Sequence, residues 1–340
     1  MHSIIRTLKI IFSKLKNKWK PPYLDCKYDL KTCSKHFDKI NIDSNGVNYT
    51  TNKDLQQLIQ KYKEHLNVSI TIDGCKEAHD SCRVFPNGQG SFDQVVAGVK
   101  QLKQDFNRIP ENKMTFSAEN VQYLKKSVQT LVELGYESTL ASYDEFHQCT
   151  EEESENFYQA LVETVDWLLE NKPSFELACL TKKFVTGRQF SMCGSKGDMI
   201  TIAPGGYIAC CQTMTPSVLE GEIEPLGLLG DVHRGITNTA LLDFMRNQTF
   251  MEPVNCVECP IKHGCDGCAA TNLAKTGYLF LDWHNCGATV AEARAQQYLI
   301  KRIKELGMED KIPYWDEIKE NHYDPDYNYL LKTVFKKDTK

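Results

Sequence analysis

The sequence predicts an α/β domain followed by a smaller, cysteine-rich domain. Up to about residue 170, segments with strand character alternate with segments of helical periodicity, which indicates a parallel sheet with helices outside. From about residue 175 the pattern changes to short strands, turns and closely spaced cysteines. At 340 residues the chain is long enough for both parts, and 41% hydrophobic with 25% charged residues is typical of a globular protein.

The first twenty residues are basic and carry apolar residues at roughly helical spacing, such as Ile4, Leu8 and Ile11. We expect a helix here, either docked on its own domain or lying on a membrane surface. Lysines interrupt the apolar run and no small-residue cleavage site follows, which argues against a signal peptide. No segment approaches the run of about 18 apolar residues that a transmembrane helix needs.

The elements that follow alternate in type, as their periodicities indicate. They are a strand at 39–43, a helix at 52–63, a strand at 68–72, a helix at 92–106, a strand at 113–116, a helix that carries Val121, Leu124, Val128 and Leu131, a strand at 138–142 and a helix at 153–170. Ser117 is expected to cap the helix that stops at Gly135. Later, 200–203 and 207–209 flank Pro204-Gly205-Gly206, which predicts a hairpin that ends at Cys210, and a terminal helix spans Ala291 to Leu306.

Charge and cysteine content narrow the class of function. The net charge of −5 gives no basic field for nucleic acid, so small molecules or peptides are the expected partners. Without an export signal we expect a cytoplasmic protein. In that reducing compartment, fourteen cysteines favour metal binding over disulfides.

The cysteines of the second half form an array with metal-ligand spacing. Its centre is Cys256-x2-Cys259-x5-Cys265-x2-Cys268, and the full set is Cys193, Cys210, Cys256, Cys259, Cys265, Cys268 and Cys286. Seven thiolates exceed the needs of one tetrahedral site, which implies two metal centres. Zinc remains an alternative, because His263 or His284 would complete a Cys3His site, but the five-residue gap between the pairs is short for a zinc ribbon.

The same residues resemble a known family. The array from Cys193 through Gly205 and Cys210 to Cys286 looks like the SPASM domain, which follows a radical S-adenosylmethionine (radical SAM) barrel. Upstream, Thr71-Ile72-Asp73-Gly74 with His79-Asp80, Arg83 and Gly90-Ser91-Phe92-Asp93 resembles the fourth strand and following loop of peptide-modifying members. The closest resemblance is to the radical SAM peptide maturases of the CXXX-repeat target type. One departure is the last Cys-x2-Cys spacing, where the common pattern has three intervening residues.

The resemblance implies a fold, cofactors and site residues. The fold is an α/β incomplete radical SAM partial (β/α) barrel followed by a cysteine-rich SPASM iron–sulfur domain. Two auxiliary four-iron four-sulfur clusters are implied, one on Cys256, Cys259, Cys265 and Cys286, the other on Cys193, Cys210 and Cys268 with an open iron or a fourth ligand from Cys179 or Cys211. Cys75, Cys82 and Cys149 are expected to be ordinary loop cysteines.

The resemblance also implies where S-adenosylmethionine would bind. The implied residues lie at the carboxyl ends of two strands and are Ser44, Asn45, Thr71, Asp73 and Arg83. Thr71 and Arg83 would hold the carboxylate of the cofactor. Without the resemblance, a strand threonine and a surface ion pair would be the preferred interpretation, and Asp73 fits a loop cap as well as a contact to cofactor or substrate.

Two motifs of the complete enzymes are missing from these 340 residues. No Cys-x3-Cys-x2-Cys triplet is present, since Leu30 stands between Cys26 and Cys33, and there is no Gly-Gly-Glu-Pro segment. We therefore expect a chain that lacks the first two barrel strands and leaves the strand near Ile40 as an unpaired edge. A truncated gene or misplaced start, a degenerate paralogue and a split enzyme are the three explanations.

The motifs and the resemblance together predict the domain boundaries and the function of the chain. The domains are 1–37, a basic helix and linker; 38–174, the partial barrel; 175–300, the SPASM domain; and 301–340, the end of the terminal helix and a tail. The expected function is modification of a ribosomally made precursor peptide, by a chain unable to cleave S-adenosylmethionine alone. A reductase or a complementing barrel fragment is a further expected partner. The alternatives are a non-catalytic iron–sulfur module that binds a peptide or partner, and a structural zinc protein.

Overall fold

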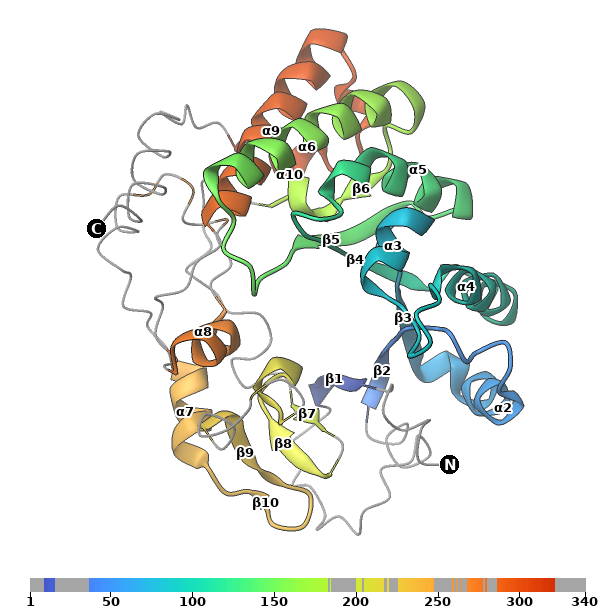
Figure 1. Ribbon diagram of the computed structural model, residues 1–340, viewed down its shortest axis with the longest axis vertical. Coiled ribbons are helices and arrows are strands. Elements are labelled where there is room, and N and C mark those ends of the chain that lie inside the picture. The colour runs from blue at the N-terminus through green and yellow to red at the C-terminus, as the bar shows by residue number, and fades with distance from the viewer. Residues whose placement is uncertain are drawn as a thin grey trace.

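The computed structural model describes two packed parts of the chain, an α/β part and a smaller β-rich part (Figure 1). The residues described are 9–15, 37–182, 184, 200–203, 205–216, 219, 226–247, 259, 261, 264, 268–277, 279 and 286–321. The α/β part contains a six-stranded sheet in the order β1-β2-β3-β4-β5-β6. Its strands are β1 (Lys9–Leu15), β2 (Phe37–Ser44), β3 (Leu66–Thr71), β4 (Glu111–Phe116), β5 (Ser138–Tyr143) and β6 (Glu176–Leu177).

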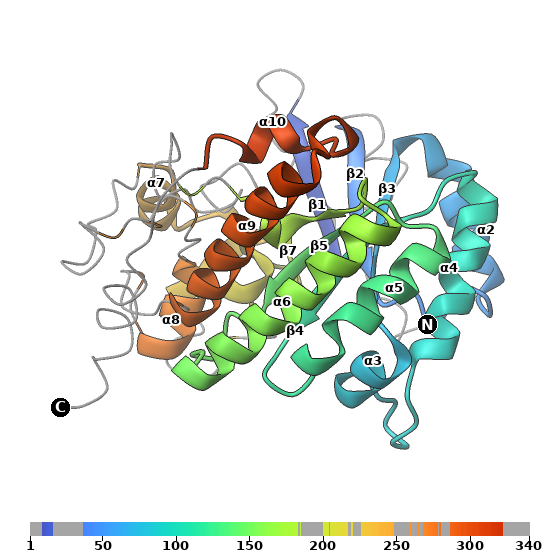
Figure 2. The same ribbon diagram turned by 90° about the horizontal axis from the view of Figure 1, so that it is seen from above.

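The strands from β2 to β6 run parallel to one another, which confirms the predicted α/β class. Helices connect them and cover one face of the sheet (Figure 2). They are α2 (Lys53–Tyr62), α3 (Lys76–Cys82), α4 (Phe92–Phe106), α5 (Leu124–Leu134) and α6 (Glu151–Asn171), with 3-10 turns at Lys63–His65, Val121–Tyr123 and Ala178–Leu180. Each βαβ step is short, so the parallel arrangement follows directly from the alternation in the sequence.

Local signals set several helix ends as expected. Thr150 and Glu153 form a capping box at the start of α6, in which each side chain accepts a hydrogen bond from the other residue's backbone N–H. Gly135 ends α5 with φ of 95°. The predicted cap at Ser117 is not formed. Asn120 instead accepts the Ser117 N–H (2.8 Å), and the chain passes through a 3-10 turn before α5.

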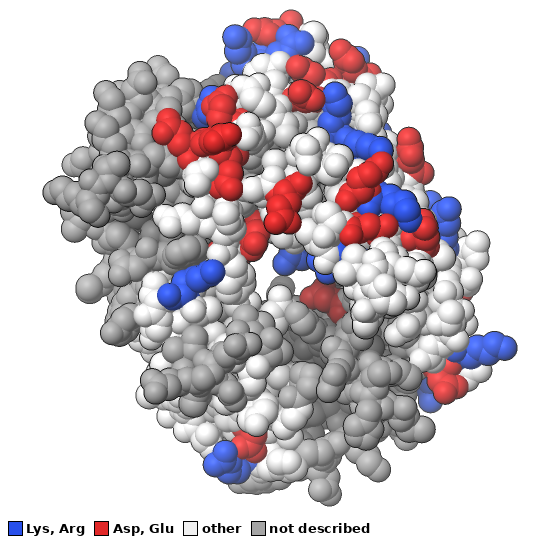
Figure 3. All heavy atoms as spheres, viewed as in Figure 1, with Lys and Arg blue, Asp and Glu red and all other residues white. Residues whose placement is uncertain are grey.

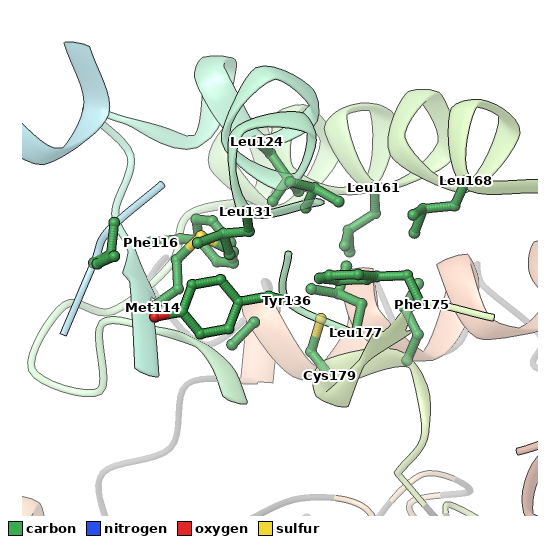
Figure 4. Close-up of a cluster of buried hydrophobic side chains, with 14 of the residues drawn as sticks. Met114, Phe116, Leu124, Leu131, Tyr136, Leu161, Leu168, Phe175, Leu177 and Cys179 are labelled. Carbon is green, nitrogen blue, oxygen red and sulfur yellow. The ribbon is translucent and has the colours of Figure 1, made fainter. Parts of the chain in front are cut away.

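The two faces of the parallel sheet differ in polarity. Apolar side chains at alternate positions, such as Ile42, Ile70 and Met114, are buried under the helices, as the period-two pattern requires. Figure 4 shows part of this core, where Phe116 and Leu131 lie near Tyr136. The intervening positions of the opposite, inner face are mostly polar and only half-buried, and include Asn41, Asp43, Ser69, Thr71, Lys113 and Thr115.

The N-terminal segment differs from its prediction. Residues 9–15 form strand β1, not a helix, and β1 pairs antiparallel with β2 so that Ile10 lies opposite Ile42. The edge at β2, expected to be unpaired, is therefore covered by the chain's own backbone. The apolar spacing that resembled a helix is also compatible with a short strand, and the free hydrogen-bonding groups of β2 favour the strand. Residues 1–8 and 16–36 lie outside the described residues.

The β-rich part is a four-stranded sheet in the order β10-β9-β8-β7, and β7 lies against β1 (Figure 1). Its strands are β7 (Thr201–Ile202), β8 (Tyr207–Ala209), β9 (Leu228–Asp231) and β10 (Gly235–Ile236). β7 and β8 form the predicted hairpin, with Gly205 and Gly206 at φ of 92° and 82° in the turn. The helices of this region are α7 (Thr239–Asn247) and α8 (Ala269–Thr276), with a 3-10 turn at Gln212–Met214.

Helix α9 (Cys286–Leu306) connects the two parts and is followed by a 3-10 turn at Glu309–Lys311 and by α10 (Trp315–Ile318). It packs along α6 (Figure 2), and its apolar face, with Ala291, Ala295 and Leu299, belongs to the core of the α/β part. The expected domain boundary at residue 300 thus falls inside one continuous helix, and the expected boundary at 175 falls just before β6, which joins the large sheet.

Candidate functional site

The candidate site lies where the parallel strands end on the inner face of the large sheet. Figure 3 shows the molecule hollowed at its centre, between the large sheet and the β-rich part of Figure 1. In parallel α/β folds, the carboxyl ends of the strands and the loops after them carry the reactive groups. Here the last residues of β2 and β3, Ser44 and Thr71, and the loop residues Asn45 and Asp73 lie at one end of the sheet.

Asp73 follows β3 at this end of the sheet and is only 3% exposed. Its Oδ1 accepts the backbone N–H of Thr115 on β4 (2.9 Å), and its Oδ2 accepts a hydrogen bond from Nε of Arg83. A buried carboxylate needs such partners, because its desolvation would otherwise favour the neutral acid. Asp73 therefore connects β3, β4 and the loop after α3, a role the sequence alone did not assign to it.

Arg83 lies directly after α3 and keeps part of its guanidinium accessible. Nε is the atom that pairs with Asp73, and the side chain is 36% exposed while that of Asp73 is 4% exposed. A guanidinium held at Nε still presents its two terminal amino groups as a planar fork, the geometry that matches a carboxylate. The pair with Asp73 thus leaves the chemistry for binding an anion on the exposed side of Arg83.

A buried histidine joins these two residues from the other side. Nδ1 of His79, a residue with no exposed surface, accepts the backbone N–H of Asp73 (3.1 Å). Nε2 lies 3.0 Å from Oγ of Ser91, and that hydroxyl donates to the carbonyl oxygen of Arg83 (2.9 Å). Burial lowers the pKa of His79, which favours the neutral ring. Both His79 and Ser91 belong to the motif found in the sequence, but the sequence alone did not predict a role for either residue.

Packing against Asp80 explains why the same motif has a glycine at position 90. Oδ1 of Asp80 accepts the N–H of Phe92, the first residue of α4 (2.9 Å). A Cβ on Gly90 would lie 2.1 Å from the carboxyl carbon of Asp80, so only glycine fits beside this carboxylate. The Asp80–Gly90 contact thus fixes the loop that places Ser91 against His79.

Ser44, Asn45 and Gly46 form a tight turn after β2. Oγ of Ser44 accepts the N–H of Gly46 (3.2 Å), and Oδ1 of Asn45 accepts the N–H of Val47 (3.4 Å). In register, Ser44 lies opposite Ile70 of the helix-covered face, not opposite the inner-face Thr71. The turn borders a small cavity between β2, β3, α2 and α4 that also contains Tyr49.

The loop cysteines of the α/β part serve the local structure. Cys75 is buried and precedes α3, with its N–H donating to Oγ of Ser127 (3.1 Å), and Cys82 is exposed at the end of the same helix. Gly74 is required next to Cys75, since its φ is 90° and a Cβ would lie 2.1 Å from Cβ of Ser127. Cys75 thus belongs to the framework next to Asp73, whereas Cys82 lies on the surface.

Four of the seven predicted metal ligands are within the described residues, and they fall into two groups. Cys210 at the end of β8 is fully buried, and Cys268 packs against the same apolar cluster. Cys259 packs with Val290 of α9, the helix that Cys286 begins. The implied partition of the ligands into two clusters stays a prediction. Cys193, Cys256 and Cys265 lie outside the described residues.

Two of the predicted ligands, Cys210 and Cys268, lie in a buried environment that favours the neutral thiol. Burial raises the pKa of Cys210 to about 11 and also raises the pKa of Cys268. Sγ of Cys268 accepts the N–H of Thr271 at the start of α8 (3.4 Å), a contact that suits a thiolate. Positive charge from a metal centre is what would ionise such thiols. Two cysteines at one apolar cluster have the donor chemistry that an iron–sulfur cluster uses, although within the described residues no three His, Cys, Asp or Glu side chains group as a metal site.

The two candidates for an eighth ligand lie in different places. Cys211 follows Cys210 and belongs to the same buried cluster, with 8% of its surface exposed. Cys179 is 1% exposed and belongs to the core of the α/β part, where burial raises its pKa. The position of Cys211 beside Cys210 favours it over Cys179.

None of the described helices is long and apolar enough to span a membrane.

A scan against protein-family models and a search of curated proteins found no match. Solved structures do match: one is "anSMEcpe with bound AdoMet", a radical SAM/SPASM sulfatase-maturating enzyme bound to S-adenosylmethionine, at a TM-score of 0.56 and 12% identity over 83% of this chain and 75% of that one. Another is the same enzyme with AdoMet and the Kp18Cys peptide, at a TM-score of 0.53 and 14% identity over 78% and 75% of the two chains. The chain therefore has the fold of a radical SAM partial barrel.

Proposed function

We propose that this chain is a radical SAM/SPASM protein of the peptide-maturase type, which binds S-adenosylmethionine (AdoMet), a ribosomally made peptide and two auxiliary four-iron four-sulfur clusters in a cytoplasmic setting. The observation that carries this is the fold match to an AdoMet-bound enzyme, combined with an anchored arginine directly after α3. The bound Kp18Cys and Cp18Cys peptides of that enzyme support a peptide partner.

Each site residue has a specific part in the proposal. The terminal amino groups of Arg83 and the hydroxyl of Thr71 hold the AdoMet carboxylate on the inner face of the sheet. Asp73 orients Arg83, because its side chain is almost fully buried and its Oδ2 accepts from Nε of the arginine. Ser44 and Asn45 shape the neighbouring turn and present backbone groups to the bound molecule.

The cysteines hold the clusters in the proposed function. Cys256, Cys259, Cys265 and Cys286 bind one, and Cys193, Cys210 and Cys268 bind the other, with Cys211 as a candidate fourth ligand. When bound, such clusters supply electron transfer or an open iron for a substrate thiolate. The protein contributes the apolar cluster around Cys210, against which Cys268 packs and which limits the access of water to these ligands.

A polypeptide of these 340 residues is not expected to cleave AdoMet alone. Reductive cleavage in the resembled enzymes needs a Cys-x3-Cys-x2-Cys site, and this sequence contains none. A complementing barrel fragment, together with a reductase, would have to supply that cluster and its electron. Formation of 5′-deoxyadenosine by the purified polypeptide with reductant alone would refute this part of the proposal.

AdoMet binding tests the site directly. Equilibrium dialysis of the reconstituted protein should show saturable AdoMet binding, and Arg83→Gln should weaken it about tenfold through loss of a charge-assisted pair. Arg234→Gln is the matched control, because Arg234 pairs with Asp231 on the surface and its side chain is 76% exposed. Equal affinity in both variants would remove Arg83 from the site.

A non-catalytic module that binds a peptide or partner is the second candidate. The pairing of β1 with β2 favours it, since β1 occupies the sheet edge to which further barrel strands would add. Such a module would bind a cysteine-containing peptide with the same affinity in the presence and absence of AdoMet. A titration with both ligands separates it from the maturase, in which the two ligands occupy one hollow and affect each other's affinity.

A further inference from the structure

We propose that His79 is a positioning residue that holds Arg83 for a carboxylate ligand through a closed ring of hydrogen bonds, and that anion binding at Arg83 weakens when His79 takes a proton. The inference rests on the proposed AdoMet-binding role of Arg83. It adds a residue that touches neither cofactor nor substrate but controls the geometry of one that does.

The ring has four members, and its bonds can be followed in one direction. Arg83 Nε donates to the Asp73 carboxylate, and the Asp73 backbone N–H donates to Nδ1 of His79 (3.1 Å). Nε2 of His79 then bonds Oγ of Ser91 (3.0 Å), which donates to the Arg83 carbonyl (2.9 Å). Arg83 is therefore held at both its side chain and its backbone.

The hydrogen bonds fix one tautomer of the ring. Because Nδ1 accepts the N–H of Asp73, it carries no proton, so the neutral imidazole has its proton on Nε2. Oγ of Ser91 accepts that proton, since its own hydrogen goes to the Arg83 carbonyl. A second proton on Nδ1 would face the Asp73 N–H donor to donor and open the ring at that bond.

The surroundings of His79 determine when this happens. The charged groups that act on it are Asp73 and Asp80, which favour the protonated ring, and Arg83 and Lys76, which oppose it. The edge of the Phe92 ring packs against it, with centroids 5.8 Å apart. Complete burial is the largest effect and lowers the pKa from 6.5, so the ring stays closed at neutral pH and opens only in acid.

The test compares AdoMet affinity between about pH 5 and 8 in three proteins, the range in which a histidine titrates. His79→Gln keeps one acceptor and one donor at similar reach but does not titrate. The unmodified protein should lose up to about tenfold in affinity in acid, the upper end of what one neutral hydrogen bond contributes. His79→Gln should bind with little dependence on pH, and the control His147→Gln, altered at an accessible pair with Glu153, should behave like the unmodified protein.

A second measurement uses no ligand. Nitrogen-15 spectra of the histidine side chains in the unmodified protein should show Nδ1 of His79 unprotonated and Nε2 protonated at neutral pH, with a pKa below 6.5. The opposite tautomer, or a His79→Gln protein with the full acid loss of affinity, overturns the inference. Failure of the unmodified protein to bind AdoMet at any pH, with the tautomer as expected, would refute the proposed function and the anion-positioning role together, while the ring itself would stand.

Discussion

Asp73 accepts hydrogen bonds from two elements at the point where β3 ends, which makes it the residue on which the site depends most. It anchors Arg83 and also satisfies the Thr115 N–H. The Thr71-Ile72-Asp73-Gly74 motif identified the residue, but two roles were open, a loop cap and a ligand contact. The structure gives it a third role, because its partners come from β4 and from the loop after α3, and their proximity depends on the tertiary fold.

Asp73→Asn is expected to destabilise the protein by about 2 kcal/mol, because the amide N–H₂ would face one of the two donors, Nε of Arg83 or the Thr115 N–H, and leave a buried group unpaired. Urea unfolding followed by circular dichroism measures the change. Asp93→Asn is the control, since the Asp93 side chain is 74% exposed and its pair with Lys76 should contribute less than about 1 kcal/mol. A loss no greater than that of the control would mean that the Asp73–Arg83 pair contributes little.

Gly74 and Gly88 provide a second comparison at the residue scale. Both have positive φ, 90° and 82°, but a Cβ on Gly74 would collide with Ser127, whereas Gly88 has open space around it. Gly88→Ala should therefore cost about 1 kcal/mol for the backbone alone. Gly74→Ala should cost about 3 kcal/mol or more, because overpacking is added. Thermal unfolding of the two variants checks this, and similar melting temperatures would show that the Ser127 contact relaxes freely.

At the scale of elements, periodicity predicted most of the α/β part. Strands β2 to β5 and helices α2, α4, α5 and α6 lie where alternation and helical spacing placed them, because each buries one face and the core selects for that pattern. β1 was predicted wrongly as a helix. Seven residues with mixed spacing do not distinguish the two structures, and the outcome depends on β2, whose free edge is a feature of the tertiary structure.

Deletion of residues 1–15 is expected to expose the β2 edge and promote self-association through strand pairing. Light scattering with size-exclusion chromatography should detect larger species. A deletion of residues 1–8 is the matched control, because it leaves β1 in place. If the longer deletion stays as monodisperse as the control, β1 does not protect the sheet.

At the scale of the whole molecule, α9 connects the cysteine-rich part to the sheet. It begins at Cys286, packs on α6, and carries Glu292, which is 2% exposed and pairs with Lys182 (2.7 Å). Gln296 on the same helix donates to the carbonyl oxygens of Leu180 and Lys182. The sequence predicted two domains in order, but not that a helix assigned largely to the second packs in the core of the first. Such packing leaves no local signature beyond the apolar face of α9.

Cluster removal is therefore expected to destabilise both parts. If Cys286 binds a cluster, the cluster fixes the first turn of a helix that belongs to the α/β core, so binding free energy adds to folding free energy. Scanning calorimetry of the reconstituted and chelator-treated proteins should show a lower melting temperature for the whole transition without iron. A Cys82→Ser protein, altered at an exposed cysteine outside the array, should show the same difference. An unchanged main transition would mean that the clusters and the sheet are independent.

The central claim is that the seven-cysteine array holds iron–sulfur clusters in a radical SAM fold, and metal analysis after anaerobic reconstitution with iron and sulfide tests it most directly. Two four-iron clusters predict about eight irons and eight sulfides per chain. Replacement of both Cys259 and Cys286 by serine should reduce this to about four irons, because both are assigned to the same cluster. Zinc in place of iron, or iron content unaffected by this double replacement, would contradict the account.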